Sequence, residues 1–393
     1  MNRSLYLFLL ALISACASRM EKTPELIPVD TIRKSPAIQA PPLKPVVVKD
    51  SLLDRQARFL AGLPQTDSGI FRVLEQEQHW QLHKALMDDS WEKMRKRRLE
   101  PMEAWRASVM EPKISDSLTL FYPFSGPDFL HAQIFYPQAP EVVMAALEPV
   151  IAVPDLPGLG AEERDMFLDT LGNSMRDLFG KSYFITLHMM KDFRQIKGVL
   201  PVFHFLLTRT GHELLTQRYF VVGAGGDPRF VPIDSLKGRT GGVQLTFRSG
   251  PEAPVRKLWY FSVNIADNGL LANPGFLAFM QRRSPYNAFV KSASYLMHID
   301  KFSGIRAELI RGSASLFQDD TGIPYRFLKT ANFEGSFFGE YMKPVKDFSW
   351  LDKQPDLDSA FTASRQPLPF SLGYHWNTRK QHYMLFIRKP GNR

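Results

Sequence analysis

The chain has 393 residues, of which 44% are hydrophobic, 23% charged and 12% aromatic. This composition excludes a disordered, collagen-like or disulfide-scaffold protein. The 49 Lys and Arg residues outnumber the 40 Asp and Glu residues and give a formal net charge of +9. The length is sufficient for one large hydrophobic core or two ordinary ones.

The N-terminus has the features of a secretory signal. A basic start is followed by an apolar run over residues 5–13, too short to span a bilayer, and then by small residues. Cys16 comes next; it is the only cysteine in the chain and therefore cannot form an intramolecular disulfide. The stretch at 12–16, LISAC, resembles the lipobox of bacterial lipoproteins, whose cysteine is acylated and becomes the mature N-terminus. We expect a signal peptide at 1–15 and lipidation of Cys16.

This resemblance implies a partner and a location. An acylated cysteine binds a lipid bilayer, because each buried CH₂ group contributes about 0.8 kcal/mol. Ala17 and Ser18 lack the aspartate that favours inner-membrane retention in bacterial lipoproteins, so the resemblance implies the outer membrane, with the leaflet left open. An exported protein is not expected to bind nucleic acid. An envelope glycan or another protein is the expected partner.

The chain after the cysteine divides into a tether and a folded part. Residues 16–50 are rich in proline and have no helical or strand periodicity, which predicts a semi-extended tether. Residues 51–393 are expected to form a single globular domain. Its first part, 51–100, has apolar residues at helical spacings, and Pro101 is expected to end that helix. The basic run at 93–98 is interpreted as a solvated helix end, with attraction to anionic lipid or lipopolysaccharide as the alternative.

The region from residue 118 onward has an α/β pattern. An apolar run at 118–124, a small-residue turn, a helical stretch to 136 and a second apolar run at 142–147 predict a Rossmann-like β-α-β unit. The fold class is therefore α/β, a mixed sheet with packed helices, preceded by N-terminal helices. Further strands are expected at 219–222, 243–247, 258–263 and 289–297, and further helices at 161–179, 200–208, 274–282 and 305–311.

The turn after the first strand is a candidate ligand-binding site. Ser125 and Gly126 precede a helix start, where backbone N–H groups can hold an anion, and Glu148 follows the next strand, where a nucleotide-binding fold places the acid that binds ribose. The arrangement resembles a class I methyltransferase unit. Only Gly126 remains of a Gly-rich loop, however, and Pro127 removes a backbone donor. Asp128 adds negative charge, which favours a cation or a neutral hydroxyl-rich ligand over a phosphate.

A second cluster of polar residues lies near the C-terminal half. Lys291 and His298 fall on the run expected to be a strand, and Asp319 and Asp320 end another apolar run. Adjacent carboxylates at the rim of a sheet suit general acid–base chemistry, so Asp128, Lys291, His298, Asp319 and Asp320 are the candidate catalytic residues. The alternative is an Asp-rich turn.

The sequence indicates no particular cofactor and no metal site. His79 and His83 are four residues apart on a predicted helix, but no third ligand is evident near them.

A resemblance to a protein family covers most of residues 118–345. This part resembles an uncharacterised family of bacterial envelope proteins through the strings YPFSGPDFL, LPVFHFLLTRTG, KSASYLMH and QDDTGIPYRF. The resemblance implies no reaction.

Three functions follow from the sequence. The first is a lipoprotein that binds a partner or has a structural role. The second is an envelope hydrolase that acts on glycan through an Asp/Glu cluster, and the third is a methyltransferase-like relic that binds a nucleotide. Convergence of Asp128, Glu148, Lys291, His298 and Asp319 or Asp320 on one cleft would favour an enzyme.

Overall fold

The computed structural model describes residues 48–184, 198–376 and 380–390, which belong to one compact unit, Val47–Arg393. The signal segment, Cys16 and nearly all of the predicted tether lie outside the described residues. Within the described ranges, no helix combines the length and the apolar character needed to cross a membrane.

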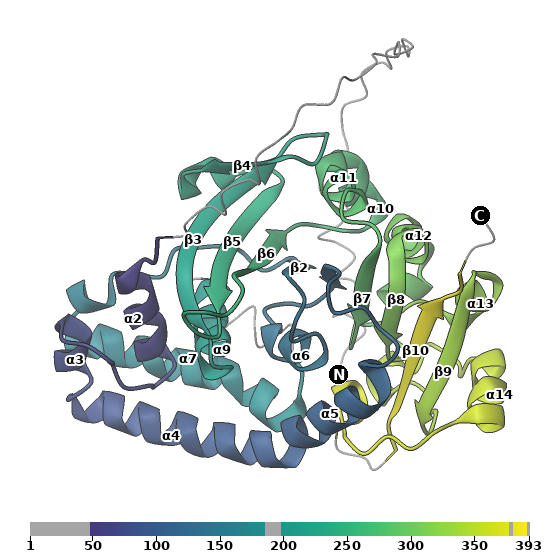
Figure 1. Cartoon of the computed structure of the whole chain (residues 1–393), viewed down its shortest axis with the longest axis horizontal. Helices are drawn as coiled ribbons and strands as arrows, with labels where there is room; N and C mark the ends of the chain where they lie inside the picture. Colours follow the sequence, from purple (N-terminus) through teal and green to yellow (C-terminus); the bar gives the residue numbers. More distant parts are fainter. Residues whose placement is uncertain (1–47, 185–197, 377–379, 391–393) are drawn as a thin grey trace, which may run out of the picture. The chain divides into compact units, whose positions relative to one another are not determined.

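A ten-stranded mixed sheet forms the centre of the unit, in the order β4-β3-β5-β6-β2-β1-β7-β8-β10-β9 (Figure 1). The strands are β1 (Leu120–Pro123), β2 (Glu141–Ala146), β3 (Glu213–Val222), β4 (Pro228–Val231), β5 (Gly241–Arg248), β6 (Arg256–Ser262), β7 (Tyr286–Val290), β8 (Ser313–Gln318), β9 (Phe333–Gly339) and β10 (His382–Arg388). The predicted α/β class with a mixed sheet is confirmed.

The five central strands are parallel, in the order β6-β2-β1-β7-β8. In chain order within this group they read 3-2-1-4-5, so the direction of strand addition reverses between β1 and β7. Open α/β sheets bind ligands outside the carboxyl ends of the strands at such a reversal. The predicted β-α-β unit is present: β1 and β2 are parallel neighbours, with Leu120 paired to Val142, and helix α6 (Phe129–Phe135) connects them.

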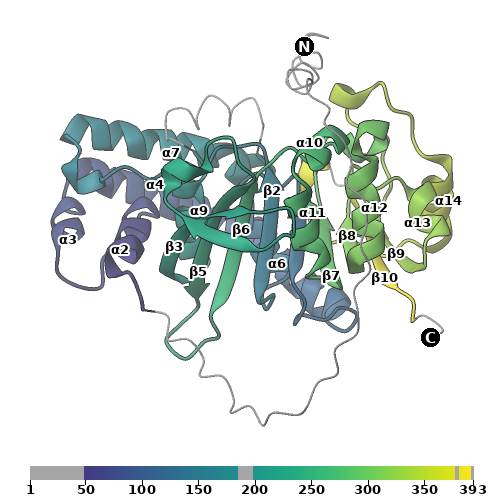
Figure 2. The same ribbon diagram turned by 90° about the horizontal axis from the view of Figure 1, so that it is seen from above.

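Two hydrophobic cores cover the two faces of the sheet. Alternation along β1 places Leu120 and Tyr122 in one core and Phe121 in the other. The first core is covered by α2 (Ser51–Leu60), α3 (Ile70–Leu74), α4 (Gln78–Met94), α5 (Glu100–Trp105), α6, α7 (Ala161–Lys181) and α9 (Leu200–Arg209). The second is covered by α10 (Asp267–Ala272), α11 (Pro274–Gln281), α12 (Ser303–Gly312), α13 (Tyr325–Thr330) and α14 (Pro355–Ser364). Figures 1 and 2 show α2, α3 and α4 beside the β3 end of the sheet and α13 and α14 beside β9.

Two sequence-based expectations about element boundaries were wrong. The first helix does not end at Pro101, because α4 continues through a π-helical turn, η1 (Arg95–Leu99), into α5 and a second π turn, η2 (Arg106–Met110). A proline ring normally clashes with the carbonyl four residues earlier, and the wider π turn that precedes Pro101 accommodates it.

The run at 289–297 is not one strand either. β7 ends at Val290, and the chain then turns sharply into η5 (Leu296–His298), a single 3₁₀ turn. The side-chain alternation that a continuous strand would impose on Lys291 and His298 is therefore absent.

Candidate functional site at the carboxyl ends of β1, β7 and β8

Three chain segments meet where β1, β7 and β8 end, and their backbone is strained. In the described ranges, the non-glycine residues with φ in the left-handed region are Phe124, Ser182, Ser292, Ser294 and Tyr295. Phe124 directly follows β1, and Ser292, Ser294 and Tyr295 lie in the turn after β7. The fifth, Ser182, ends α7, and its carbonyl accepts a hydrogen bond from Lys291. Such conformations cost about 1–3 kcal/mol each and cluster at functional sites. The backbone thus singles out this edge of the sheet.

Asp128 is the centre of a buried polar network. Its carboxylate caps α6 and accepts hydrogen bonds from the Tyr122 hydroxyl (3.0 Å) and the His131 backbone N–H (3.3 Å). Nζ of Lys291 lies 2.7 Å from its Oδ2, and Nδ1 of His131 lies 2.8 Å from its Oδ1. Burial alone would raise the pKa of Asp128, but the neighbouring His131 and Lys291 hold it well below its usual range. Lys291 also donates to the Ser182 carbonyl (2.6 Å), so the network is internally satisfied.

Asp319 and Asp320 are adjacent in sequence but lie in different environments. Asp319 accepts hydrogen bonds from the backbone N–H groups of Ser292 (2.9 Å) and Thr321 (3.0 Å) and from the Thr321 hydroxyl. Burial and the charge of Asp320 raise the pKa of Asp319 to about 6.

Asp320 accepts a hydrogen bond from the Tyr295 hydroxyl (2.9 Å), and its Oδ1 lies 2.9 Å from Nε2 of His382. Burial alone would raise the pKa of Asp320, but these partners lower it. Two carboxyl groups with separated pKa values are therefore side by side, and such pairs often divide acid and base roles.

Two buried hydroxyl groups next to Asp319 lack a hydrogen-bond partner among the described residues. They are Oγ of Ser292 and the hydroxyl of Tyr383. A Cβ atom built on Gly373, whose φ is +75°, would lie 2.9 Å from Ser292 Oγ, 3.2 Å from Asp319 Oδ2 and 3.3 Å from the Tyr383 hydroxyl. A methyl group would be too close to these atoms, so the glycine lets the backbone pack closely against three oxygen atoms. Buried polar atoms without partners are rare and costly, so the Ser292 and Tyr383 hydroxyls are candidate contacts for a polar ligand.

Tyr374 contacts the turn that carries Ser292. Its hydroxyl donates to the Ser292 carbonyl (2.9 Å) and lies 3.0 Å from Ser294 Oγ. Ser292, Ser294 and Tyr374 are half-buried, whereas Asp319 is 6% exposed. Asp319 is therefore more deeply buried than these three neighbours.

Of the remaining predicted residues, His298 contacts this cluster, whereas Glu148 and Ser125 have other partners. His298 joins it through a contact of 3.0 Å between its Nε2 and the Asp320 carbonyl, and burial lowers its pKa to about 4. Glu148 follows β2 as predicted, but the Tyr260 hydroxyl donates to its carbonyl (2.9 Å) and to its carboxylate (3.3 Å). No hydrogen bond between described residues joins Glu148 to the cluster. Ser125 donates to the Gly126 carbonyl (2.9 Å) within the turn after β1.

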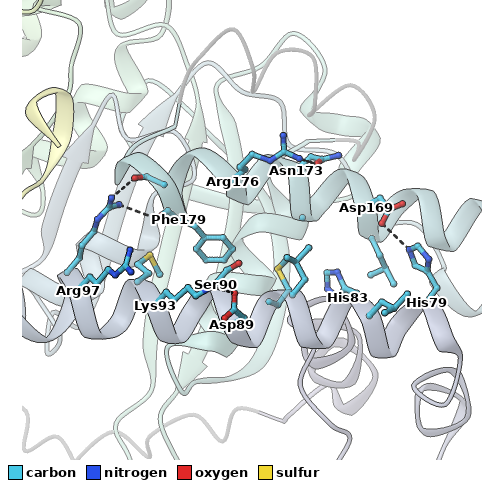
Figure 3. Close-up of a pocket in the computed structure, with 18 of the residues that line it drawn as sticks. His79, His83, Asp89, Ser90, Lys93, Arg97, Asp169, Asn173, Arg176 and Phe179 are labelled. Carbon is cyan, nitrogen blue, oxygen red and sulfur yellow. Dashed lines mark hydrogen bonds and ion pairs between the residues drawn. The ribbon is translucent and has the colours of Figure 1, made fainter. Parts of the chain in front are cut away.

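His79 and His83 have different hydrogen-bond partners. Nε2 of His79 lies 3.0 Å from a carboxylate oxygen of Asp169 (Figure 3). Nε2 of His83 lies 2.9 Å from the Leu60 carbonyl. The two histidine side chains therefore contact different partners.

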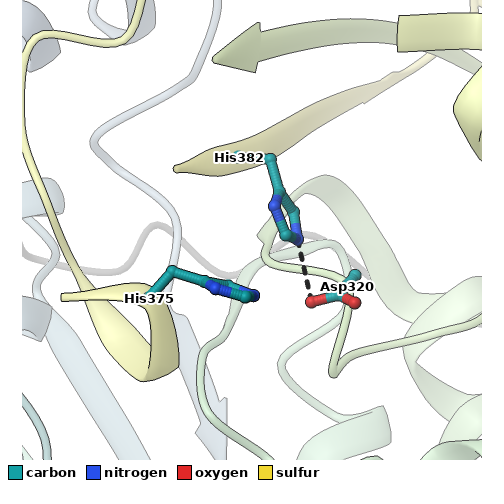
Figure 4. A group of neighbouring side chains, drawn as sticks. All are labelled: Asp320, His375 and His382. Atoms are coloured by element: carbon teal, nitrogen blue, oxygen red, sulfur yellow. Dashed lines mark ion pairs between the residues drawn. The ribbon is translucent and has the colours of Figure 1, made fainter. Parts of the chain in front are cut away.

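Three other side chains could hold a metal ion by their position. Ligand atoms of Asp320, His375 and His382 lie within 4.8 Å of one another, and all three residues are buried (Figure 4). The backbone N–H of Met342 donates to Nδ1 of His382 (3.2 Å), so the neutral ring carries its proton on Nε2, the atom that faces Asp320. A metal ion would need that nitrogen unprotonated. The position of this proton favours an Asp320–His382 ion pair over a metal centre, although Nε2 itself makes no hydrogen bond among the described residues.

Several members of the cluster were not among the predicted site residues. His131 lies three residues after Asp128, one helical turn along, and that spacing could have identified it. Ser292 lies in a string that the sequence singles out, but the continuous-strand interpretation concealed its strained turn. His382 and Tyr383 have no sequence signal, because β10 reaches β8 only through the fold.

Comparisons with known proteins add no relative. No protein-family model matches the chain, and no curated protein and no solved structure is significantly similar to it.

Proposed function

We propose that this protein is a lipoprotein of the bacterial envelope whose carboxyl-edge cluster catalyses hydrolysis, with Asp319 as the proton-transfer group. The observation that supports this most is the carboxyl pair with separated pKa values, placed beside the unpartnered Ser292 and Tyr383 hydroxyls on a strained backbone. Strain and unsatisfied buried groups persist only where something offsets their cost, and catalysis is a common reason.

The proposed substrate is a neutral, hydroxyl-rich molecule such as an envelope glycan. The converging Ser292, Asp319 and Tyr383 oxygens can exchange hydrogen bonds with sugar hydroxyls, and the Asp320 carboxylate disfavours an anionic substrate. In the proposed step, protonated Asp319 donates its proton to the leaving oxygen as the C–O bond breaks. A water molecule then adds its hydroxide to the carbon and returns a proton to Asp319.

The experiment compares Asp319→Asn with Asp352→Asn, an exposed carboxylate that serves as the control. The full chain in detergent is incubated with purified peptidoglycan glycan fragments from pH 5 to 8, and new reducing ends are counted. We expect activity that changes near pH 6 and falls about 100-fold or more in Asp319→Asn, while Asp352→Asn is unchanged. Binding of the fragments without cleavage would instead support the non-catalytic binding protein. If the fragments are neither bound nor cleaved, both proposals are contradicted.

The proposed anchor can be tested separately. Cys16→Ser should give an unprocessed or soluble, unacylated chain, because Cys16 is the only cysteine available for lipidation. Detergent partitioning and mass analysis of the N-terminal peptide measure this. An unmodified wild-type peptide that begins after Cys16 would contradict lipidation.

One observation favours a methyltransferase-like nucleotide binder as a second candidate. The parallel strands have the 3-2-1-4-5 order, and the reversal point between β1 and β7 is where such folds bind nucleotides. The buried Asp128–Lys291 pair occupies this point, and Glu148 is engaged by Tyr260. A thermal-shift titration with S-adenosylmethionine distinguishes the two functions: we expect no shift, and a saturable rise in Tm would favour the nucleotide binder.

A further inference from the structure

A groove of about 910 Å³ lies between α4 and α7, apart from the site described above (Figure 3). Its apolar lining residues are Leu82, Leu86, Met87, Met94, Leu168, Phe179 and Trp376. Gly172 on α7 keeps it open, because a Cβ at this position would lie 3.3 Å from the terminal methyl of Met87. A larger residue at position 172 would narrow the groove.

Two of the lining leucines are unusually exposed. Leu82 is 61% and Leu86 58% exposed, although both are large apolar side chains. They are four residues apart on α4 and therefore lie on the same side of the helix. Their row continues through Ser90 and Lys93 to Arg97, at spacings of four, three and four. One row of the groove thus changes from apolar to cationic along the helix.

The charges of the groove are not balanced. Four cations line it, Lys93, Arg97, Arg98 and Arg176, against two acids, Asp89 and Asp169. Asp89 is paired with Lys93 (2.6 Å) and Asp169 with His79 (3.0 Å).

The three arginines of the groove differ in how they are engaged. Arg98 donates to Ser182 and to the last carbonyls of α7. In the described part of the chain, neither Arg97 nor Arg176 has an acidic partner within 4.0 Å, and both are exposed. Arg97 also lies in the π turn η1, and π turns frequently occur at functional sites.

We propose that this groove binds a single-chain anionic amphiphile, with its acyl chain along Leu82 and Leu86 and its anionic head near Arg97 and Arg176. A concave apolar lining with a few well-placed polar groups is the usual form of a small-molecule site. The cations on both walls select a negative head group. This proposal does not depend on the hydrolase proposal.

The probe is lysophosphatidylglycerol with a brominated acyl chain, used below its critical micelle concentration. Bromine quenches tryptophan fluorescence at short range, and Trp376 lines the groove. The chain carries Cys16→Ser, so that no covalent lipid competes. We expect saturable quenching, most of which is lost in Trp376→Phe. Affinity for the zwitterionic lysophosphatidylcholine should be at least tenfold weaker.

Two variants test the two parts of the groove. Arg97→Gln with Arg176→Gln should weaken lysophosphatidylglycerol binding at least tenfold, whereas Arg229→Gln with Arg239→Gln, two exposed arginines elsewhere, should leave it unchanged. Gly172→Leu should block binding of both lipids by filling the space beside Met87. An unchanged Tm in each variant controls for folding.

Three results would overturn the proposal. The first is equal affinity for lysophosphatidylglycerol and lysophosphatidylcholine, and the second is an equal loss of affinity in the two arginine double variants. The third is binding to anionic vesicles without binding to the monomeric lipid. The last would indicate a membrane-surface contact instead.

Discussion

Nζ of Lys291 lies 2.7 Å from Oδ2 of Asp128, and each side chain is only 2% exposed. This ion pair joins the segment after β7 to the cap of α6, at the reversal point of the sheet. A buried ion pair contributes little net stability when intact, because both charges lose their hydration. Removal of one partner leaves the other charge buried and alone. The pair therefore constrains which substitutions the site tolerates.

The first prediction concerns this pair. Lys291→Met should lower the free energy of unfolding by about 3–5 kcal/mol, because the Asp128 carboxylate stays buried without its cation. The double variant with Asp128→Asn should recover part of this loss. Urea unfolding at pH 7 measures both. If the free energy of unfolding of Lys291→Met lies within about 1 kcal/mol of the wild-type value, water reaches Asp128 in the folded protein.

The second prediction concerns acid. Burial lowers the pKa values of His83, His204, His212 and His298 to about 4 each. Unfolded histidines titrate near 6.5, so between pH 6.5 and 4 the unfolded chain binds more protons than the folded one. The stability from these groups is present above pH 6.5 and is lost as the pH falls. Each contributes up to about 1.4 kcal/mol per pH unit in this window.

His204 provides the sharpest single test, because it is fully buried on α9 and its Nε2 contacts Gln217 at 2.8 Å. His204→Leu should reduce the slope of stability against pH by up to one proton near pH 5. The readout is this slope, since loss of the Gln217 contact changes the stability at every pH. A slope equal to that of wild type would show that His204 is already protonated or reached by water in the fold.

The sequence predicted the central β-α-β unit because β1 and β2 are continuous apolar runs, as strands buried on both faces must be. It singled out Asp128, Lys291, Asp319 and Asp320 as candidates but left open whether they converge. It did not predict the turn after β7, because Ser292 and Tyr295, in left-handed conformations, contact Asp319 and Asp320, which follow the distant strand β8. His382 likewise joins the cluster only through strand pairing.

The third prediction concerns metal. Exposure to EDTA should leave Tm unchanged, because the Met342 N–H holds the His382 ring in the tautomer that cannot ligate through Nε2. Elemental analysis before and after dialysis is the matching measurement. A stoichiometric transition metal whose removal lowers Tm would contradict the proton assignment at His382. It would also make Asp320, His375 and His382 a metal centre.

The last prediction concerns Asp319, whose pKa of about 6 in the fold lies above its ordinary value of 3.8. Between these values the folded state binds more protons than the unfolded state, so this group destabilises the fold as the pH rises. The penalty is absent below pH 3.8 and complete above pH 6, where it reaches roughly 3 kcal/mol. Asp319→Asn cannot ionise and should escape this penalty. Its stability relative to wild type should therefore increase from pH 4 to 6.5 and then become constant.

The pH dependence of this difference is the readout, because Asn also replaces one acceptor oxygen with a donor facing Ser292 or Thr321 at every pH. That lost hydrogen bond subtracts a constant of about 1–3 kcal/mol. Asp352→Asn should show neither the offset nor the pH dependence, since Asp352 is exposed. Urea unfolding at half-unit steps of pH resolves the two effects. A difference independent of pH would mean that Asp319 titrates normally, and it could then not serve as a proton donor near neutral pH.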